Sequence, residues 1–116
     1  MKDNIDLSGL LTGLGSEAPS QLGVFAFLGL GVVESLATGA LSASDAVRVL
    51  FNSQNCQYVH KKLRDEVADK IMSHGVQLAD LFEALPEQVA QQEFQRELEK
   101  IRSLCLQLLE LHRAAA

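Results

Sequence analysis

Several residue types that mark specialised folds are scarce or missing in this sequence. Tryptophan is absent, one tyrosine is present, and the 116 residues include two cysteines. The cysteines, Cys56 and Cys105, are too few for a disulfide scaffold and form no Cys-x-x-Cys pair. We therefore expect two free thiols in a reducing compartment. The scarcity of aromatic residues leaves aliphatic side chains and alanine to supply most of the core.

Long hydrophobic runs are missing as well. The longest uncharged stretch runs from Ala18 to Val33, contains Pro19 and is closed by Glu34. A transmembrane helix needs about 20 apolar residues. The N-terminal segment Met1–Asp6 contains acidic residues, whereas a signal peptide begins with a positively charged region. The sequence therefore predicts no membrane segment and a cytoplasmic location.

The overall composition is that of one folded domain. Hydrophobic residues make up 47% of the chain and charged residues 22%, close to the average for soluble domains. The net charge of −5 at pH 7 disfavours nonspecific attraction to nucleic acid and to anionic lipid.

Helical periodicity predicts an all-α single-domain bundle of about five helices with a long C-terminal helix. Residues 20–116 form this helical domain. Residues 1–19, rich in glycine, serine and leucine, form an N-terminal arm that we expect to become ordered on docking.

Capping residues place the first two helices. The first is predicted over 21–38, with Ser20 as its N-cap and Gly39 as its stop. Its residues are apolar all round, which predicts burial all round. The second begins at Ser42, with Asp45 at the acidic position of a capping box, and residues 52–55 break it.

The third helix has the clearest periodicity. One buried face is predicted from Cys56, Val59, Leu63, Val67 and Ile71, and Gly75 is the expected stop. A short amphipathic helix over 78–85 follows. The last helix runs from Pro86 to Arg113, with its buried face at Phe94, Leu98, Ile101, Cys105 and Leu108.

The sequence offers little for catalysis or for metal binding. Cys56 and His60 are four residues apart and could face one point, but no orienting acid or oxyanion donor is visible beside them. Cys105 and His112 lie about 10.5 Å apart along a helix, too far to share one zinc ion with that pair. We therefore predict a non-enzymatic protein without a metal or a cofactor.

A helix-turn-helix regulator that binds DNA is the alternative. The segment 46–64 carries four positive side chains and no acid. Gln54, Asn55, Gln57 and Tyr58 would stand at the N-terminal end of a recognition helix. Gln57, Lys61, Lys62 and Arg64 would form the DNA-binding face. The turn lacks the usual glycine and the chain is acidic, so we expect nucleic-acid binding to be weak.

Charge asymmetry favours contact with another protein. Residues 80–99 carry six acids and one base, Arg96, opposite in sign to the segment 46–64. Patches of opposite sign can meet within a fold, across a dimer or on a partner. The sequence therefore predicts a protein–protein interaction module, regulatory or adaptor in role, whose protein partner it does not identify.

The last helix indicates a homodimer. From Pro86 to Arg113 it measures about 42 Å, whereas a compact chain of this size is roughly 35 Å across, so the helix would overhang its domain. Apolar positions near its end cover an arc of about 220°. Either the N-terminal arm or a symmetric partner helix could cover that arc, and two-fold dimers are the commonest assembly. The predicted interface residues are Leu104, Leu106, Leu109 and Leu111.

Overall fold

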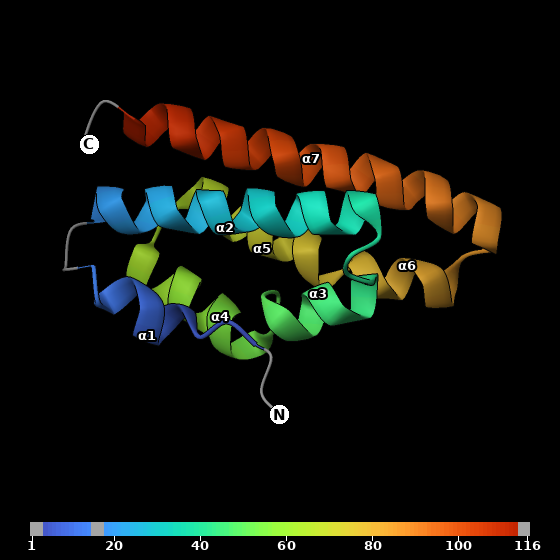
Figure 1. Cartoon of the computed structure of the whole chain (residues 1–116), viewed down its shortest axis with the longest axis horizontal. Helices are drawn as coiled ribbons and strands as arrows, with labels where there is room; N and C mark the ends of the chain where they lie inside the picture. Colours follow the sequence, from blue (N-terminus) through green and yellow to red (C-terminus); the bar gives the residue numbers. More distant parts are fainter. Residues whose placement is uncertain (1–3, 15–17, 114–116) are drawn as a thin grey trace.

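Every regular element is helical in the residues that the structure describes, 4–14 and 18–113 of a computed structural model (Figure 1). In chain order the elements are α1 (Leu7–Thr12), α2 (Ala18–Thr38), α3 (Ala43–Val49), α4 (Ser53–Tyr58), the π-helical segment η1 (Val59–Leu63), α5 (Glu66–Val76), α6 (Leu78–Ala84) and α7 (Glu87–Arg113). The predicted all-α bundle with a long C-terminal helix is confirmed. Its helices outnumber the expected five because the arm contains α1 and the third helix is divided.

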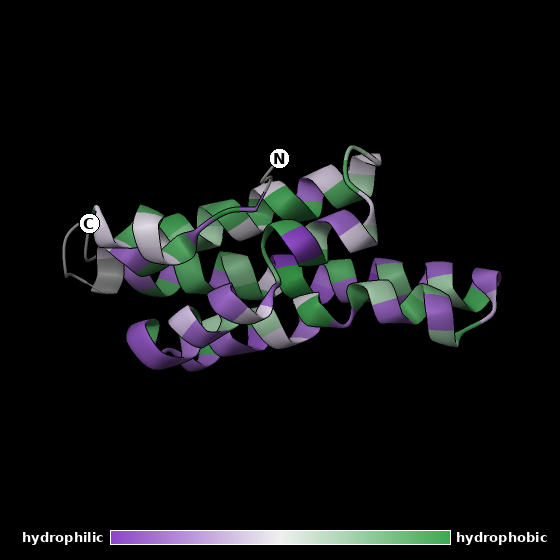
Figure 2. Cartoon of the chain, turned by 90° about the horizontal axis from the view of Figure 1, so that it is seen from below, coloured by the Kyte–Doolittle hydropathy of each residue, from purple (hydrophilic) through white to green (hydrophobic). Residues whose placement is uncertain are grey.

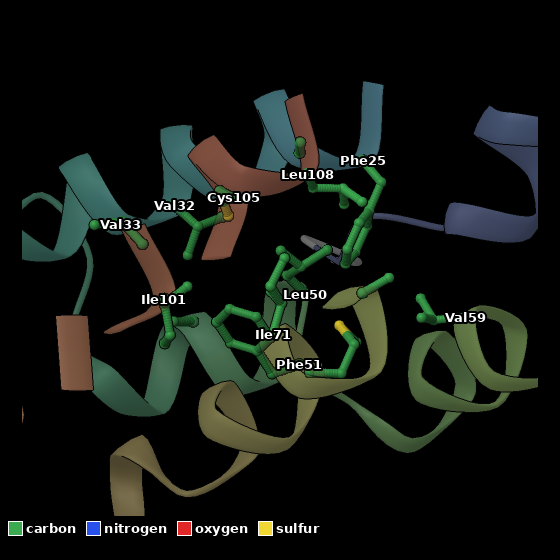
Figure 3. Close-up of a cluster of buried hydrophobic side chains, with 14 of the residues drawn as sticks. Phe25, Val32, Val33, Leu50, Phe51, Val59, Ile71, Ile101, Cys105 and Leu108 are labelled. Carbon is green, nitrogen blue, oxygen red and sulfur yellow. The ribbon is translucent and has the colours of Figure 1, made fainter. Parts of the chain in front are cut away.

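The two longest helices, α2 and α7, run side by side in opposite directions (Figure 1). Gly29 of α2 faces Cys105 of α7, and a Cβ added at Gly29 would lie 2.6 Å from the Cys105 Sγ atom. Glycine is therefore needed here, because it lets the two backbones approach closely. The predicted inner face of α7 is buried as expected, at Phe94, Leu98, Ile101, Cys105 and Leu108. Figure 3 shows this core, in which Phe51, Ile71 and Ile101 lie close together.

The predicted overhang of the last helix is wrong. α7 has 27 residues, or about 40 Å at 1.5 Å per residue, and the molecule measures 44 × 32 × 23 Å along its principal axes. The domain is elongated rather than spherical, and α6 supports the beginning of α7 (Figure 1). The length of α7 therefore gives no reason of its own for a dimer.

The predicted continuous third helix is also wrong. The chain passes from α4 into η1, and then Arg64 adopts a left-handed conformation with φ 51°. Asp65 caps the next helix, because its side chain accepts a hydrogen bond from the Ala68 amide at 2.9 Å. Val59, Leu63 and Ile71 are buried as expected, but they come from two separate helices.

Gly75 does not end a helix, as the sequence suggested. It lies inside α5, one residue before its end. An added Cβ would overlap the Phe51 ring. Glycine therefore serves close packing at this position, and α5 ends without needing a special residue.

Of the other predicted helix ends, two are confirmed and one is wrong. Ser42 and Asp45 form the expected capping box at the start of α3. Gly39 follows α2 with φ 85°, a conformation that favours glycine. α2 begins at Ala18, however, so Ser20 lies in its first turn and is not its N-cap.

The segment expected only to break a helix in fact anchors the N-terminal arm. Asn55 is 2% exposed. Its Oδ1 atom accepts a hydrogen bond from the Leu7 amide at 3.1 Å. Its Nδ2 atom donates to the carbonyl oxygens of Ile5 at 2.8 Å and Leu50 at 3.0 Å. The Ile5 amide adds a bond to the Val49 carbonyl oxygen at 2.8 Å. Residues 5–7 are therefore docked on the helical domain.

One further property of α2 bears on its environment. Within the described residues, Ser20–Thr38 is a helix long and apolar enough to cross a membrane by length and composition alone. Core helices of soluble proteins have the same property. In this fold Phe25, Val33 and Leu36 of α2 are buried in the core that it shares with α7.

Candidate functional site

Phe27 is the most exposed of the large hydrophobic side chains in the described part of the chain. Its side chain is 66% exposed, although α2 is otherwise the main partner of α7 in the core. The sequence prediction that α2 is buried all round is therefore wrong. A helix that is apolar on every face does not reveal which face remains in solvent.

The surroundings of Phe27 on α2 are small and uncharged. Gly23 and Gly31 lie four residues before and after it, and therefore on the same side of the helix. A Cβ added at either glycine would have no atom of the described residues within 4 Å. The ring of Phe27 therefore stands between two stretches of open helix backbone.

The outer edge of α7 continues this surface. Arg102 of α7 lies 3.7 Å from the exposed Glu34 of α2, which places these two helix edges beside each other. Leu106 and Leu109 follow Arg102 by four and seven residues and lie on the same side of α7. Leu106 is 52% exposed and Leu109 is half-buried. We call this surface the α2–α7 face; it consists of Gly23, Phe27, Leu30, Gly31 and Glu34 of α2 with Arg102, Leu106 and Leu109 of α7.

The four leucines predicted as an interface do not form one surface. Leu106 and Leu109 belong to the α2–α7 face. Leu104 and Leu111 lie on the opposite side of α7, across the buried pair Cys105 and Leu108. Leu111 is 61% exposed. The structure thus divides the predicted interface into two edges, and the edge with Leu106 and Leu109 lies beside α2.

A recess beside η1 holds the Cys/His pair noted in the sequence. Its walls include Cys56, His60 and Asp69, and the His60 Nδ1 atom lies 3.3 Å from the Asp69 Oδ2 atom. The acid that sequence reasoning could not find is therefore Asp69, which α5 supplies. Burial, and next the charge of Asp69, raise the pKa of the Cys56 thiol. This shift disfavours the thiolate that nucleophilic chemistry needs.

The residues predicted to bind DNA are partly withdrawn from solvent. Gln57, Lys61, Lys62 and Arg64 are exposed, and their end of the molecule is mostly hydrophilic, at the lower left of Figure 2. Asn55 and Tyr58 are buried. Asn55 anchors the arm, and the Tyr58 hydroxyl donates to the Gln21 Oε1 atom at 2.8 Å. Two of the four expected base-reading side chains therefore cannot reach a DNA groove in this conformation.

The four residues considered for a metal site are not gathered in one place. Cys56 and His60 line the recess beside η1. Cys105 is buried against Gly29, and His112 lies 3.7 Å from Asp65. Within residues 4–14 and 18–113, no three histidine, cysteine or acidic side chains are grouped so as to hold a metal ion.

The burial of Cys105 gives a testable pH dependence. Burial raises the pKa of its thiol from an ordinary 9.0 to about 12. The folded state therefore holds the proton more tightly, and stability falls between pH 9 and about 12 as the unfolded thiol ionises. The loss reaches about 4 kcal/mol at 1.36 kcal/mol per pH unit. Urea unfolding from pH 8 to 11 should show a steeper decline for the wild type than for Cys105→Ala. Parallel declines would contradict this burial.

Comparison with known proteins identifies the family. The family model described as a protein of unknown function, DUF3969, matches residues 21–115. Because the match covers most of the chain, the chain belongs to this family. No curated protein and no solved structure matches it.

Proposed function

We propose that this DUF3969 protein is a non-enzymatic protein–protein interaction module and that the α2–α7 face is its contact surface. The observation that carries the proposal is the exposure of Phe27, at 66%, between two open stretches of backbone. We propose that such a module has a regulatory or adaptor role in the cytoplasm.

Burial of Phe27 in a contact with a partner would be energetically favourable. Burying a phenylalanine side chain is favourable by about 1.5–3 kcal/mol, and Phe27, at 66% exposure, gains only part of that energy among the described residues. Aromatic residues are enriched in protein interfaces, and exposed apolar patches with a polar rim mark interaction sites. Here Glu34 and Arg102 supply polar groups at the edge of the patch.

The recess beside η1 gives less support for a catalytic or ligand-binding function. The recess beside η1 combines His60 with Asp69, but the raised pKa of Cys56 keeps its thiol protonated at neutral pH. Both positive and negative side chains line the neighbouring space, where Lys61 and Arg64 face Glu66 and Asp69. This mixture does not select an ionic substrate of either sign.

Capture from native extract tests the proposal. Tagged wild type, Phe27→Glu and the control Val89→Glu should be compared at equal concentration. Val89 is also a large exposed hydrophobic residue, but it lies in the first turns of α7, away from the α2–α7 face. We expect wild type and Val89→Glu to retain the same protein and Phe27→Glu to lose it, because a carboxylate cannot enter an apolar contact. Identical capture by all three proteins would refute the use of this face.

A further inference from the structure

We infer that the partner at the α2–α7 face is a second copy of this chain, in a two-fold dimer where Phe27 of each copy packs on open backbone beside a glycine of the other. The inference rests on the proposed function and names the partner. It follows from the glycines of α2, from the charge of the face and from its area.

The glycines of α2 differ in what they do within the chain. Gly29 is required by the close approach of Cys105, where an added Cβ would lie 2.6 Å from the Sγ atom. Gly23 and Gly31 have no atom within 4 Å of an added Cβ. Both nevertheless weaken the helix relative to alanine, and no contact among the described residues offsets that loss. A partner that packs against the bare backbone at these glycines would offset the lost helix stability.

The position of these glycines makes the face complementary to itself. One turn on each side of Phe27 the backbone carries no side chain, so the exposed ring projects between two positions with open space. A two-fold interface pairs the same patch on both copies and therefore requires such self-complementarity. A two-fold axis perpendicular to α2 also makes the two α2 helices antiparallel, an arrangement in which their macrodipoles oppose each other favourably.

Charge favours contact at this face over other surfaces. Each copy carries a net charge of −5, so two copies repel each other over most approaches. Glu34 is the one charged residue between Ser20 and Thr38. Arg102 of α7 is 3.7 Å from it and offsets its charge, whereas the exposed Glu99 and Glu110 flank Leu106 on the α7 side. The α2 side of the face therefore carries one charge, which Arg102 offsets, and two like-charged copies repel each other less there than over most other approaches.

The whole layer of α2 and α7 that surrounds this face is close in area to the surface that a stable dimer uses. The 21 residues of α2 span about 31 Å, and packed helices lie about 8–10 Å apart. With α7 beside it, the layer offers roughly 30 by 20 Å, or roughly 600 Å² in projection. Standard interfaces bury about 800 Å² of accessible surface on each partner, and accessible surface exceeds its projection.

Sedimentation equilibrium over a wide concentration range tests the inference. Wild type should approach twice the chain mass of 12.6 kDa. Phe27→Glu should raise the dissociation constant at least about 30-fold, the effect of losing a central contact residue. Gly31→Gln should also weaken the dimer, because its side chain would occupy the open space on which Phe27 of the other copy packs. The same change should leave the monomer equally or more stable, because it improves the helix and has open space.

Two controls separate the outcomes. Val89→Glu should leave the dimer unchanged, and Leu111→Glu tests the opposite edge of α7. A strictly monomeric wild type would overturn the second copy as partner; the proposed function would still stand if capture depended on Phe27. A dimer lost with Leu111→Glu but kept with both Phe27→Glu and Gly31→Gln would overturn the placement of the interface.

Discussion

Gly75→Ala should destabilise the fold by about 2–3 kcal/mol, although alanine is the better helix former. Gly75 lies inside α5, and the new methyl group would overlap the Phe51 ring, which is buried in the core. The ring has no empty space to move into in a close-packed interior. Urea unfolding followed by circular dichroism measures the loss.

Gly31→Ala provides the matched control on another helix. It makes the same chemical change at a helical glycine, but no atom lies within 4 Å of the new methyl group. It should therefore stabilise the fold by about 1 kcal/mol, the difference in helix propensity. Both changes are best measured with Phe27→Glu present, so that self-association does not contribute. Stabilisation by Gly75→Ala would show that α5 and Phe51 are not packed as described.

Asn55→Ala should destabilise the fold by about 3 kcal/mol. It removes the partner of the Leu7 amide and of the carbonyl oxygens of Ile5 and Leu50. A buried polar group left without a partner costs about 1–3 kcal/mol. The amide of Leu7 should also lose most of its protection from hydrogen exchange, because the arm is released.

Asn52→Ala is the control for this change. Asn52 caps α4 by accepting a hydrogen bond from the Asn55 amide at 2.9 Å, and loss of such a cap costs about 1 kcal/mol. The arm should remain docked in this variant, with the Leu7 amide still protected. Equal effects of the two substitutions would show that Asn55 acts only within α4 and does not anchor the arm.

The periodic helices could be predicted, because their buried faces repeat along the chain. The inner face of α7 was predicted residue by residue, and so was the capping box of Ser42 and Asp45. These features depend on neighbours within a few positions. Local spacing is therefore enough to define them.

The break at Arg64 could not be predicted in the same way. Arginine seldom adopts a positive φ, and the apolar spacing continues across the break. Asp65, as a capping aspartate, was the available signal. Gly75 was misread because a glycine near a helix end suits both a stop and a close contact. Only the position of Phe51 distinguishes the two, and that contact is distant in sequence.

The candidate site was predicted in part. Leu106 and Leu109 were expected at an interface and belong to the α2–α7 face. Phe27 was missed because α2 is apolar on every side. The spacing of Gly23, Phe27 and Gly31 was the signal that could have indicated an outer face. Asp69 was missed because it lies nine residues after His60 and comes close to it only through the break at Arg64.

Photo-cross-linking from position 27 tests the central claim most directly. Phe27 is replaced by benzoylphenylalanine, which keeps an aromatic side chain, and the purified protein is irradiated. We expect a product of twice the 12.6 kDa chain mass, with the cross-link mapped by mass spectrometry to residues 23–31 of the second chain. A product that remains at the mass of one chain at every concentration, or a cross-link to another surface, would contradict the claim.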